Sequence, residues 1–189
     1  MPLAQLNIAT TLYPIDAPEM VDFVNNLAPI NAIAQASPGF IWRLQDDSGD
    51  ATHIQVFDDP NMIVNMSVWE SIDALKAFMF KTHHRDFIRR KKEWFHHSDT
   101  DTYVLWWIPE GHTPSIDEAI SKLTFLRDNG ESPNAFTFKR PFNQSECLPC
   151  LKIPALEDDK KGTWKNQTKY PAKVFFTLKL IVSVSELIQ

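Results

Sequence analysis

The sequence predicts a domain in which strands and helices are mixed along the chain. Between residues 3 and 142, hydrophobic residues recur in two periods, every second residue or every third to fourth residue. No glycine-rich phosphate-binding loop follows a predicted strand, which argues against a nucleotide-binding fold. A hydrophobic content of 43% with 23% charged residues is typical of a globular protein with a buried core.

The first predicted element is a strand over residues 3–11, whose alternation places Asn7 on one face with its neighbours two residues away. A helix capped by Asp16 follows and ends before residue 37. Residues 39–45 are predicted to form the second strand, with Phe40, Trp42 and Leu44 on one face. Residues 51–57 are a candidate for a short further strand between two turns.

The second half begins with a strand over residues 62–69 and a helix that Ser71 caps. The pattern then predicts a helical segment over 84–95, a strand over 101–109 and a capped helix over 115–130 that begins at Ser115 and ends in Gly130. A strand over 134–142 follows. Residues 143–189 are polar and aperiodic, and we expect a loosely ordered tail. The domain is therefore predicted to span residues 1–142.

Composition narrows the classes of partner and location. A net charge of −5 disfavours a nucleic-acid partner. The apolar run at 174–189 is interrupted by Lys179 and Glu186 and is shorter than the roughly 20 residues of a membrane span, so no membrane is predicted. No signal-peptide pattern is visible, and we expect a cytoplasmic protein. Cys147 and Cys150 are too few for a disulfide framework, and no metal-binding spacing occurs.

Several segments carry a resemblance to a known superfamily. They are AQLNIA, SPGFIWRLQDDSGDAT, VFDDP, NMSVWES, KEWF, VLWWIPEGHTP and AFTFKRPF. Residues 3–142 resemble the dimeric α+β barrel superfamily, which includes the antibiotic biosynthesis monooxygenases, and within it the uncharacterised DUF3291 family. The resemblance implies an α+β fold. The resemblance further implies a ferredoxin-like sheet with helices on one face and a homodimer whose two sheets pack into a barrel. The segment after residue 142 has no counterpart in this resemblance, and its composition predicts an irregular C-terminal extension.

The superfamily also contains haem-degrading monooxygenases, polyketide cyclases and stress-response proteins, so the fold leaves the function open. The haem-degrading branch has an asparagine on the first strand, a tryptophan on the helix after the VW joint, and a histidine ligand. Asn7 fits the first position, but Phe78 and Lys91 stand near the other two. No cofactor is therefore predicted and haem is disfavoured. Haem binding by another histidine stays an alternative that a Soret band would detect.

In such a fold the pocket lies between the sheet and its helices. The predicted catalytic residues are His84, Asn7 and Arg43. His84 is a candidate general base because imidazole titrates near neutral pH. Asn7 and Arg43 would stabilise the resulting anion. The alternative for Arg43 is a surface ion pair with Asp46, Asp47 or a second copy.

A second set of residues is predicted to bind the substrate. It comprises Asn65, Trp42, Trp69, Phe78, His83, Trp94 and Trp107. The alternative for the aromatic members is a place in the core or in a dimer interface. Trp106 and Trp107 must point to opposite faces of their strand, so at most one can enter the pocket. His83 lies about a quarter turn away from His84, so only one of the two can face the core squarely.

These observations favour a small cofactor-independent monooxygenase-like enzyme that acts on an aromatic or polyketide-type intermediate of secondary metabolism. A polyketide cyclase would use the same enolate, and product analysis separates the two. A non-enzymatic ligand-binding or stress-response dimer is the third hypothesis. The expected partners are a small aromatic or polyketide-like substrate and a second copy of the chain.

Overall fold

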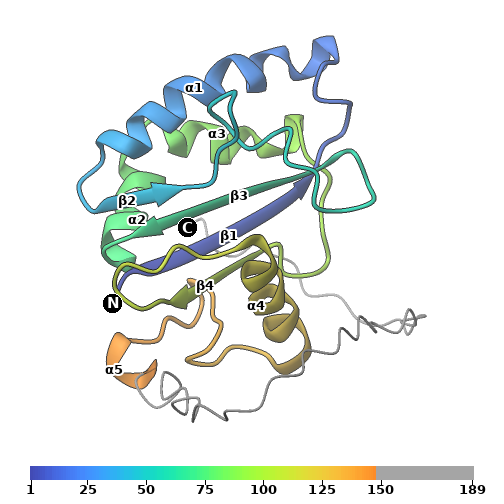
Figure 1. The fold of residues 1–189 in the computed structure, drawn as a ribbon. Coiled ribbons are helices and arrows are strands. Elements are labelled where there is room, and N and C mark those ends of the chain that lie inside the picture. Colours follow the sequence, from blue (N-terminus) through green and yellow to red (C-terminus); the bar gives the residue numbers. More distant parts are fainter. Residues whose placement is uncertain (148–189) are drawn as a thin grey trace, which may run out of the picture. The chain divides into compact units, whose positions relative to one another are not determined.

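The computed structural model describes residues 1–147. A four-stranded sheet has helices on both of its faces (Figure 1). In chain order the elements are β1 (Leu3–Thr10), a 3-10 turn (Pro18–Met20), α1 (Val21–Ala36), β2 (Phe40–Arg43), β3 (Met62–Trp69), α2 (Ile72–Lys81), α3 (His84–Arg90), a second 3-10 turn (Lys91–Glu93), β4 (Tyr103–Trp107), α4 (Ile116–Asn129) and α5 (Gln144–Cys147).

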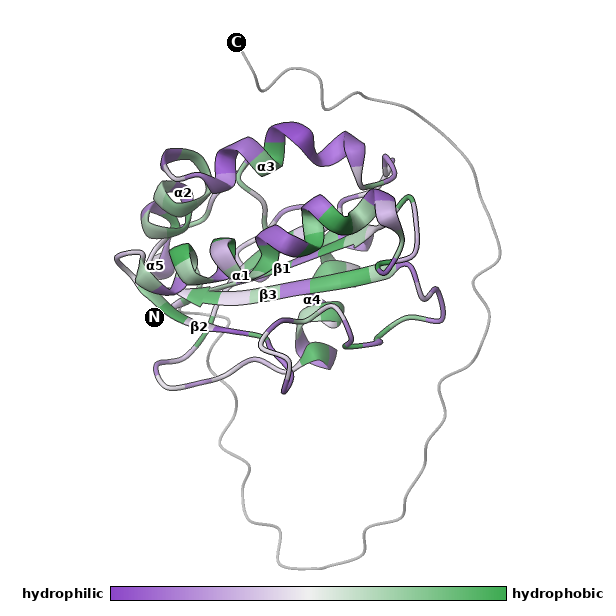
Figure 2. Cartoon of the chain, turned by 90° about the horizontal axis from the view of Figure 1, so that it is seen from above, coloured by the Kyte–Doolittle hydropathy of each residue, from purple (hydrophilic) through white to green (hydrophobic). Residues whose placement is uncertain are grey.

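The strand order is β2-β3-β1-β4, and every neighbouring pair is antiparallel. The two long strands β1 and β3 occupy the centre, and β2 and β4 form the edges. Together with the chain order β1-α1-β2-β3-α2-β4, this is the ferredoxin-like arrangement. The predicted α+β class and ferredoxin-like sheet are confirmed. The prediction that helices lie on one face only is wrong, because α4, an additional helix after β4, packs on the other face (Figure 2).

Alternate residues of the strands lie on opposite faces of the sheet, because successive side chains point to opposite sides. The odd-numbered Leu3, Trp69 and Trp107 belong to a core under α1 and α2, and the even-numbered Leu6 and Trp106 belong to a core under α4. Figure 2 shows α1, α2 and α3 on one side of the strands and α4 on the other. We call these faces the three-helix side and the α4 side.

The α4 side is closed over β1 and β4 by a helix that begins and ends as the sequence predicts. The Ser115 hydroxyl accepts a hydrogen bond from the Glu118 amide at 3.1 Å, and Gly130 ends the helix at φ 74°. Leu123 is fully buried against the sheet. The Trp106 indole N–H donates to a Glu118 carboxylate oxygen at 2.9 Å, which ties β4 to α4.

On the three-helix side, α2 is fixed at its start and along its length. The Ser71 hydroxyl accepts from the Ala74 amide at 3.1 Å, which confirms the predicted cap. Gly39, at φ 81°, precedes β2 and lies against this helix. A β-carbon at Gly39 would stand 2.6 Å from the Ala74 β-carbon, closer than real contacts allow. The chain before β2 therefore packs on α2 more tightly than any side chain at residue 39 would permit.

Strand β2 contains an irregularity that the sequence did not indicate. Phe40 pairs with Trp69 of β3, and Trp42 pairs with the adjacent Val68. Ile41 is therefore an extra residue in β2. Trp42 consequently lies on the α4 side and Arg43 on the three-helix side. The prediction that Phe40 and Trp42 share a face is wrong because this bulge interrupts the alternation.

Two predicted strands are not formed within residues 1–147. Residues 51–57 consist of turns and unpaired chain. In the segment 134–142, Phe136 exchanges two backbone hydrogen bonds with Leu105 of β4, but the pairing stops at this bridge. Pro141 lacks the amide hydrogen that a longer ladder would need. The segment therefore caps the outer edge of β4 without extending the sheet.

The predicted cap of the first helix is also wrong. The helix is entered through the turn Pro18–Met20, whose cap position is Ala17, and no side chain caps it. Proline at the first helical position supplies a fixed φ and needs no amide partner, so Asp16 is not required there.

The described chain continues past residue 142 into α5, where Cys147 is buried in the three-helix-side core. The division of the chain at residue 142 stays a prediction, and residues 148–189, including Cys150, lie outside the described residues. Among residues 1–147, no helix combines the length and the hydropathy that crossing a membrane requires.

Candidate active site

Five polar side chains lie side by side on the three-helix side of the sheet. Gln5 and Asn7 come from β1, Asn65 and Ser67 from β3, and Arg43 from β2. In the strand register, Gln5 pairs with Ser67 and Ser67 with Arg43, and Asn7 pairs with Asn65. We call these five residues the polar floor. A sheet face covered by helices is ordinarily apolar, so a polar group at its centre indicates a site.

The space above the polar floor is not filled by the helices. Asn7 and Asn65 are exposed although both lie in the middle of central strands, on the face that α1 and α3 cover. Solvent, and therefore a ligand, can reach their amide groups.

One end of the polar floor is bounded by a stack of three rings. The His84 ring lies 4.7 Å from the Phe78 ring, and Phe78 lies 5.1 Å from Trp69 at an interplanar angle of 22°. The Trp69 indole N–H donates to the Ser67 hydroxyl at 2.9 Å. The stack therefore joins the first residue of α3 to the polar floor, and it offers aromatic faces beside hydrogen-bonding groups.

The opposite end is closed by a second aromatic cluster that joins α1 to α3. Trp94 is buried and stacks on Phe87 at 5.7 Å, and Phe23 of α1 lies 5.7 Å from the same indole. The Arg90 guanidinium lies 4.6 Å above the Trp94 ring and contacts the Asp22 carboxylate at 2.5 Å. These contacts hold the two helices together beyond the polar floor.

Two buried side-chain nitrogens in residues 1–147 have no hydrogen-bond partner, and both belong to predicted catalytic residues. They are Nε of Arg43 and Nδ1 of His84. A buried polar group left unsatisfied costs about 1–3 kcal/mol, so a hydrogen bond to a ligand or a water molecule at either nitrogen would be stabilising. Arg43 donates through Nη2 to the Gly49 carbonyl at 2.7 Å and forms no ion pair with Asp46 or Asp47.

The electrostatics of the site favour a neutral imidazole. Burial lowers the pKa of His84 below its ordinary value of 6.5, and the Met79 carbonyl opposes this effect only in part. Burial likewise lowers the pKa of Arg43, against the attraction of Asp50, although a guanidinium stays charged at neutral pH. The site thus combines a proton acceptor with a fixed positive charge.

The structure does not bring every predicted residue to this site. His83 is exposed, with Nδ1 3.0 Å from the Asp86 carboxylate, so His84 is the histidine of the pair that faces inward. Trp42 lies on the opposite face because of the bulge in β2. Trp107 is on the three-helix side, but it sits at the edge strand and its indole donates to the Phe142 carbonyl at 2.8 Å.

Sequence reasoning missed two members of the polar floor, Gln5 and Ser67. Each stands two residues from a predicted site residue in the same strand, Gln5 from Asn7 and Ser67 from Asn65. The period of two was therefore the available signal, since residues i and i+2 share a face.

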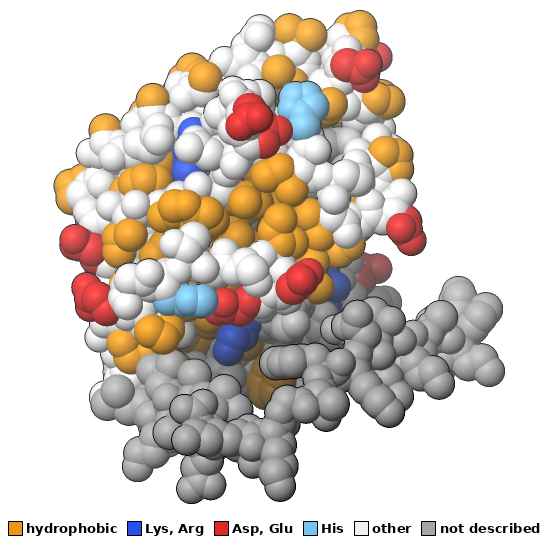
Figure 3. Space-filling view, viewed as in Figure 1, with side chains coloured by type: hydrophobic (Ala, Val, Ile, Leu, Met, Phe, Trp, Pro, Cys, Tyr) orange, Lys and Arg blue, Asp and Glu red, His pale blue; other side chains and the backbone are white. Residues whose placement is uncertain are grey.

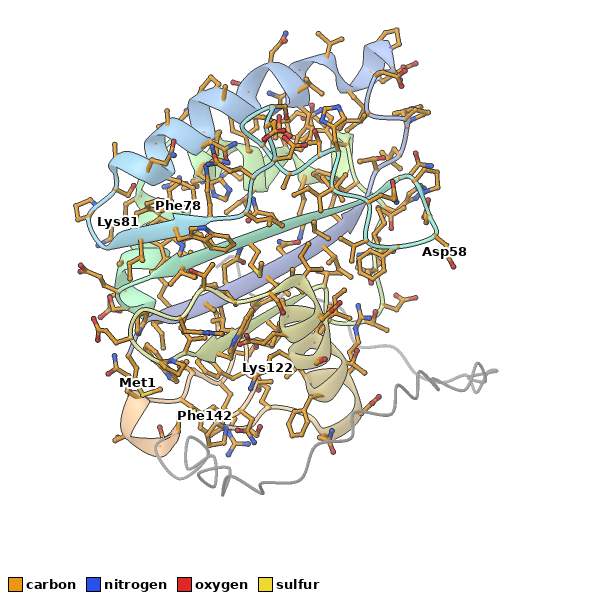
Figure 4. The ribbon with its side chains drawn as sticks, viewed as in Figure 1. Met1, Asp58, Phe78, Lys81, Lys122 and Phe142 are labelled. Carbon is orange, nitrogen blue, oxygen red and sulfur yellow. The ribbon has the colours of Figure 1, made fainter. Side chains whose placement is uncertain are left out.

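Two hollows open at the surface beside α2. One, of about 380 Å³, lies between α2 and the chain before β2, and Phe78 and Lys81 line it (Figure 4). The other, of about 590 Å³, is lined by Met1 and Trp107 among others. Neither is lined by His84, Asn7 or Arg43, but the first shares Phe78 with the stack.

The residues present do not fit the haem-degrading pattern. Phe78 fills the position expected for a tryptophan, and Lys91, near the expected histidine, is exposed on the turn after α3. In the described part of the chain, no three His, Cys, Asp or Glu side chains gather as metal ligands would. We therefore derive no step through a bound group.

The fold and site define a ferredoxin-like α+β domain with a polar, ring-bounded floor under its helices. The profile of the family described as "Domain of unknown function (DUF3291)" matches residues 2–150. The chain belongs to this family, as the sequence predicted. No curated protein matches the chain.

Several solved structures are similar to part of the chain. SnoaB, a cofactor-independent oxygenase from Streptomyces nogalater, is 16% identical, with a TM-score of 0.39 over 58% of this chain and 94% of its own. Rv0793 from Mycobacterium tuberculosis is 11% identical, with a TM-score of 0.42 over 60% and 100%. NE2512 from Nitrosomonas europaea is 10% identical, with a TM-score of 0.41 over 60% and 95%. At these values we transfer no activity from them.

Proposed function

We propose that this protein is a cofactor-independent monooxygenase that acts on an aromatic or polyketide-type substrate carrying a phenol or enol. The single observation that carries the proposal is the pair of unpartnered buried nitrogens on His84 and Arg43. One belongs to a base that is neutral at pH 7, and the other to a permanent cation. Arg43 is part of the polar floor with the exposed amides, and His84 belongs to the ring stack that bounds it. This is the combination that forms and holds an oxyanion.

In the proposed reaction, His84 takes the proton of the substrate hydroxyl, and Arg43 and Asn7 hold the resulting oxygen anion. The anion transfers an electron to O2, and the two radicals combine to form a carbon–oxygen bond. The resulting peroxide anion takes the proton back from the His84 imidazolium and becomes a hydroperoxide. The hydroperoxide then loses water, which breaks the O–O bond and leaves a carbonyl. Overall the substrate loses two hydrogen atoms and gains one oxygen atom, which is a four-electron oxidation. The second oxygen atom of O2 leaves as water.

The aromatic residues support a flat substrate. The stack that contains Trp69 and Phe78 forms one end of the site, and the cluster around Trp94 forms the other. A planar ring system between them would place its hydroxyl over the amides of the floor. This agrees with a fused aromatic or polyketide-type intermediate, as the sequence analysis favoured.

The test incubates the purified chain with a panel of phenols, naphthols and cyclic 1,3-diketones under 18O2. Oxygen uptake with one 18O atom in the product supports oxygenation. Loss of water without oxygen uptake identifies a polyketide cyclase, which would start from the same enolate. Binding of panel members without any conversion would leave a non-enzymatic ligand-binding protein and overturn the proposal.

We further propose that the active form is a homodimer in which the α4 sides of two copies meet. Figure 3 shows a continuous hydrophobic area on the face that carries α4. Side chains that are only partly buried against the α4-side core are Trp42, Leu44, Ile54, Val56, Phe57, Met62 and Ile116. A second copy would remove this apolar surface from water. Light scattering of the purified chain measures the mass directly.

A further inference from the structure

Two amide side chains of the polar floor are hydrogen-bonded to each other. Nε2 of Gln5 lies 2.9 Å from Oδ1 of Asn65, and 3.5 Å from the backbone carbonyl oxygen of Asn65. The pair is diagonal in the sheet, since Gln5 stands opposite Ser67 and Asn65 stands opposite Asn7. Such diagonal neighbours on one face are within reach of long side chains.

Both contacts fit one orientation of the two amides. A backbone carbonyl can only accept a hydrogen bond, so the end of Gln5 that faces it must be the NH2 group. The atom of the Asn65 side chain that receives the same NH2 group must then be its oxygen. The Asn65 NH2 group is consequently turned away from Gln5.

Asn65 is exposed to the space above the floor, so its NH2 group is a donor that a ligand can reach. Asn7, directly opposite, makes no side-chain hydrogen bond in the described part of the chain and can turn either end of its amide to a ligand. The two neighbouring asparagines therefore differ. One is fixed as a donor, and the other is adjustable.

We propose that Gln5 is a positioning residue that holds the Asn65 amide as a donor, so that the site selects ligands in their phenolate or enolate form. This inference rests on the proposed function and deepens it. A donor fixed before the ligand arrives needs no reorientation when negative charge develops. An anionic oxygen only accepts hydrogen bonds, so it gains more from such a donor than a neutral hydroxyl does.

The test uses the full chain and 4-nitrophenol, whose phenol and phenolate forms have different absorption spectra. Gln5→Glu replaces the donor with an acceptor, so the Asn65 NH2 group turns toward residue 5 and its oxygen faces the floor. We expect Gln5→Glu to weaken phenolate binding at least tenfold relative to phenol binding. Gln5→Met, which only releases the amide, should weaken it about twofold, since two orientations then become equivalent.

A double-substitution cycle separates positioning from the negative charge that the Gln5→Glu substitution introduces. Asn65→Leu removes the amide, and Gln5→Glu in that background reports the effect of the charge alone. We expect the loss of phenolate preference in Gln5→Glu to be several times smaller once Asn65 is absent. Equal losses in the two backgrounds would show that Gln5 does not act through Asn65 and would overturn the inference.

NMR spectroscopy tests which of the two amides faces the ligand. In 15N-labelled chain, titration with 4-nitrophenolate should shift the side-chain NH2 signals of Asn65 and leave those of Gln5 nearly unchanged, and the opposite result contradicts the assignment. Failure of any phenol to bind would contradict the inference and the proposed function together. Binding without turnover would contradict only the function.

Discussion

The two faces of the sheet are made by alternate residues of the same strands, yet they differ in how many polar side-chain groups are left without a partner. On the α4 side, Leu6, Met66 and Trp106 are packed with apolar neighbours, and the indole of Trp106 is satisfied by Glu118. On the three-helix side, the central residues are amides and a serine, and two nitrogens at its border have no partner. The contrast supports our proposals that one face serves packing and assembly and that the other carries the chemistry.

The largest expected effect comes from the border of the polar floor. His84→Gln should lower kcat/KM by about 10²–10⁴-fold, because it removes the general base. The matched control is His83→Gln, since His83 is the adjacent residue but its side chain is exposed beside the Asp86 carboxylate and the Phe87 ring. Its kcat/KM should stay within about twofold of the wild type. Oxygen-uptake kinetics measure both variants, and equal losses would remove His84 from the mechanism.

On the α4 side, a charge in the partly exposed apolar surface should weaken the proposed dimer. Leu44→Asp places a carboxylate in the partly exposed apolar surface, and we expect it to weaken the dimer about 100-fold. Met62→Lys is a second variant at the same surface. Val24→Asp, at an exposed position of α1, is the control and should leave the dimer intact. Sedimentation equilibrium measures the dissociation constants, and a wild-type chain that is monomeric at all concentrations contradicts the assignment.

The helix caps offer a smaller and matched comparison. Ser71 caps α2 on the three-helix side and Ser115 caps α4 on the other. Each substitution by alanine should lower the free energy of unfolding by about 1 kcal/mol. Only Ser71→Ala should also lower kcat, because α2 carries Phe78, on which His84 stacks. Urea unfolding and kinetics of the two variants decide this, and an equal change in kcat would argue against the division between the faces.

The smallest expected effect is on the pH dependence of stability. Burial lowers the pKa of His84 in the folded chain below 6.5, the value expected when unfolded. The unfolded state therefore binds a proton first as the pH falls below 6.5. Stability declines until the pH passes the lower, folded pKa, and then levels off. His84→Gln should remove this decline, whereas His83→Gln should retain it, as unfolding titrations between pH of about 5.5 and 7.5 would measure.

Much of the fold followed from the sequence because its signals are local. Periodicity located the helices and the four strands that pair, and Ser71, Ser115 and Gly130 marked helix ends. The segment 134–142 has strand composition but pairs only at Phe136, since pairing depends on a partner edge that the local sequence does not encode.

The site was less predictable for the same reason. Asn7 and His84 could be placed by counting along one strand and one helix. Trp42 and Arg43 could not be placed in this way, because an extra residue in β2 reverses the alternation and no residue type in the sequence indicates it. The orientation of the Asn65 amide depends on Gln5, which is close only through the pairing of β1 with β3. Contacts between distant segments were therefore beyond the sequence pattern.

The close approach of Gly39 to Ala74 makes the position of the His84 imidazole sensitive to the addition of a single methyl group at residue 39. Alanine there would have to push Ala74 and its helix outward, and Phe78 and the ring that rests on it would move with them. Natural variation that adds even the smallest side chain at Gly39 should therefore impair the proposed activity while sparing the opposite face of the molecule.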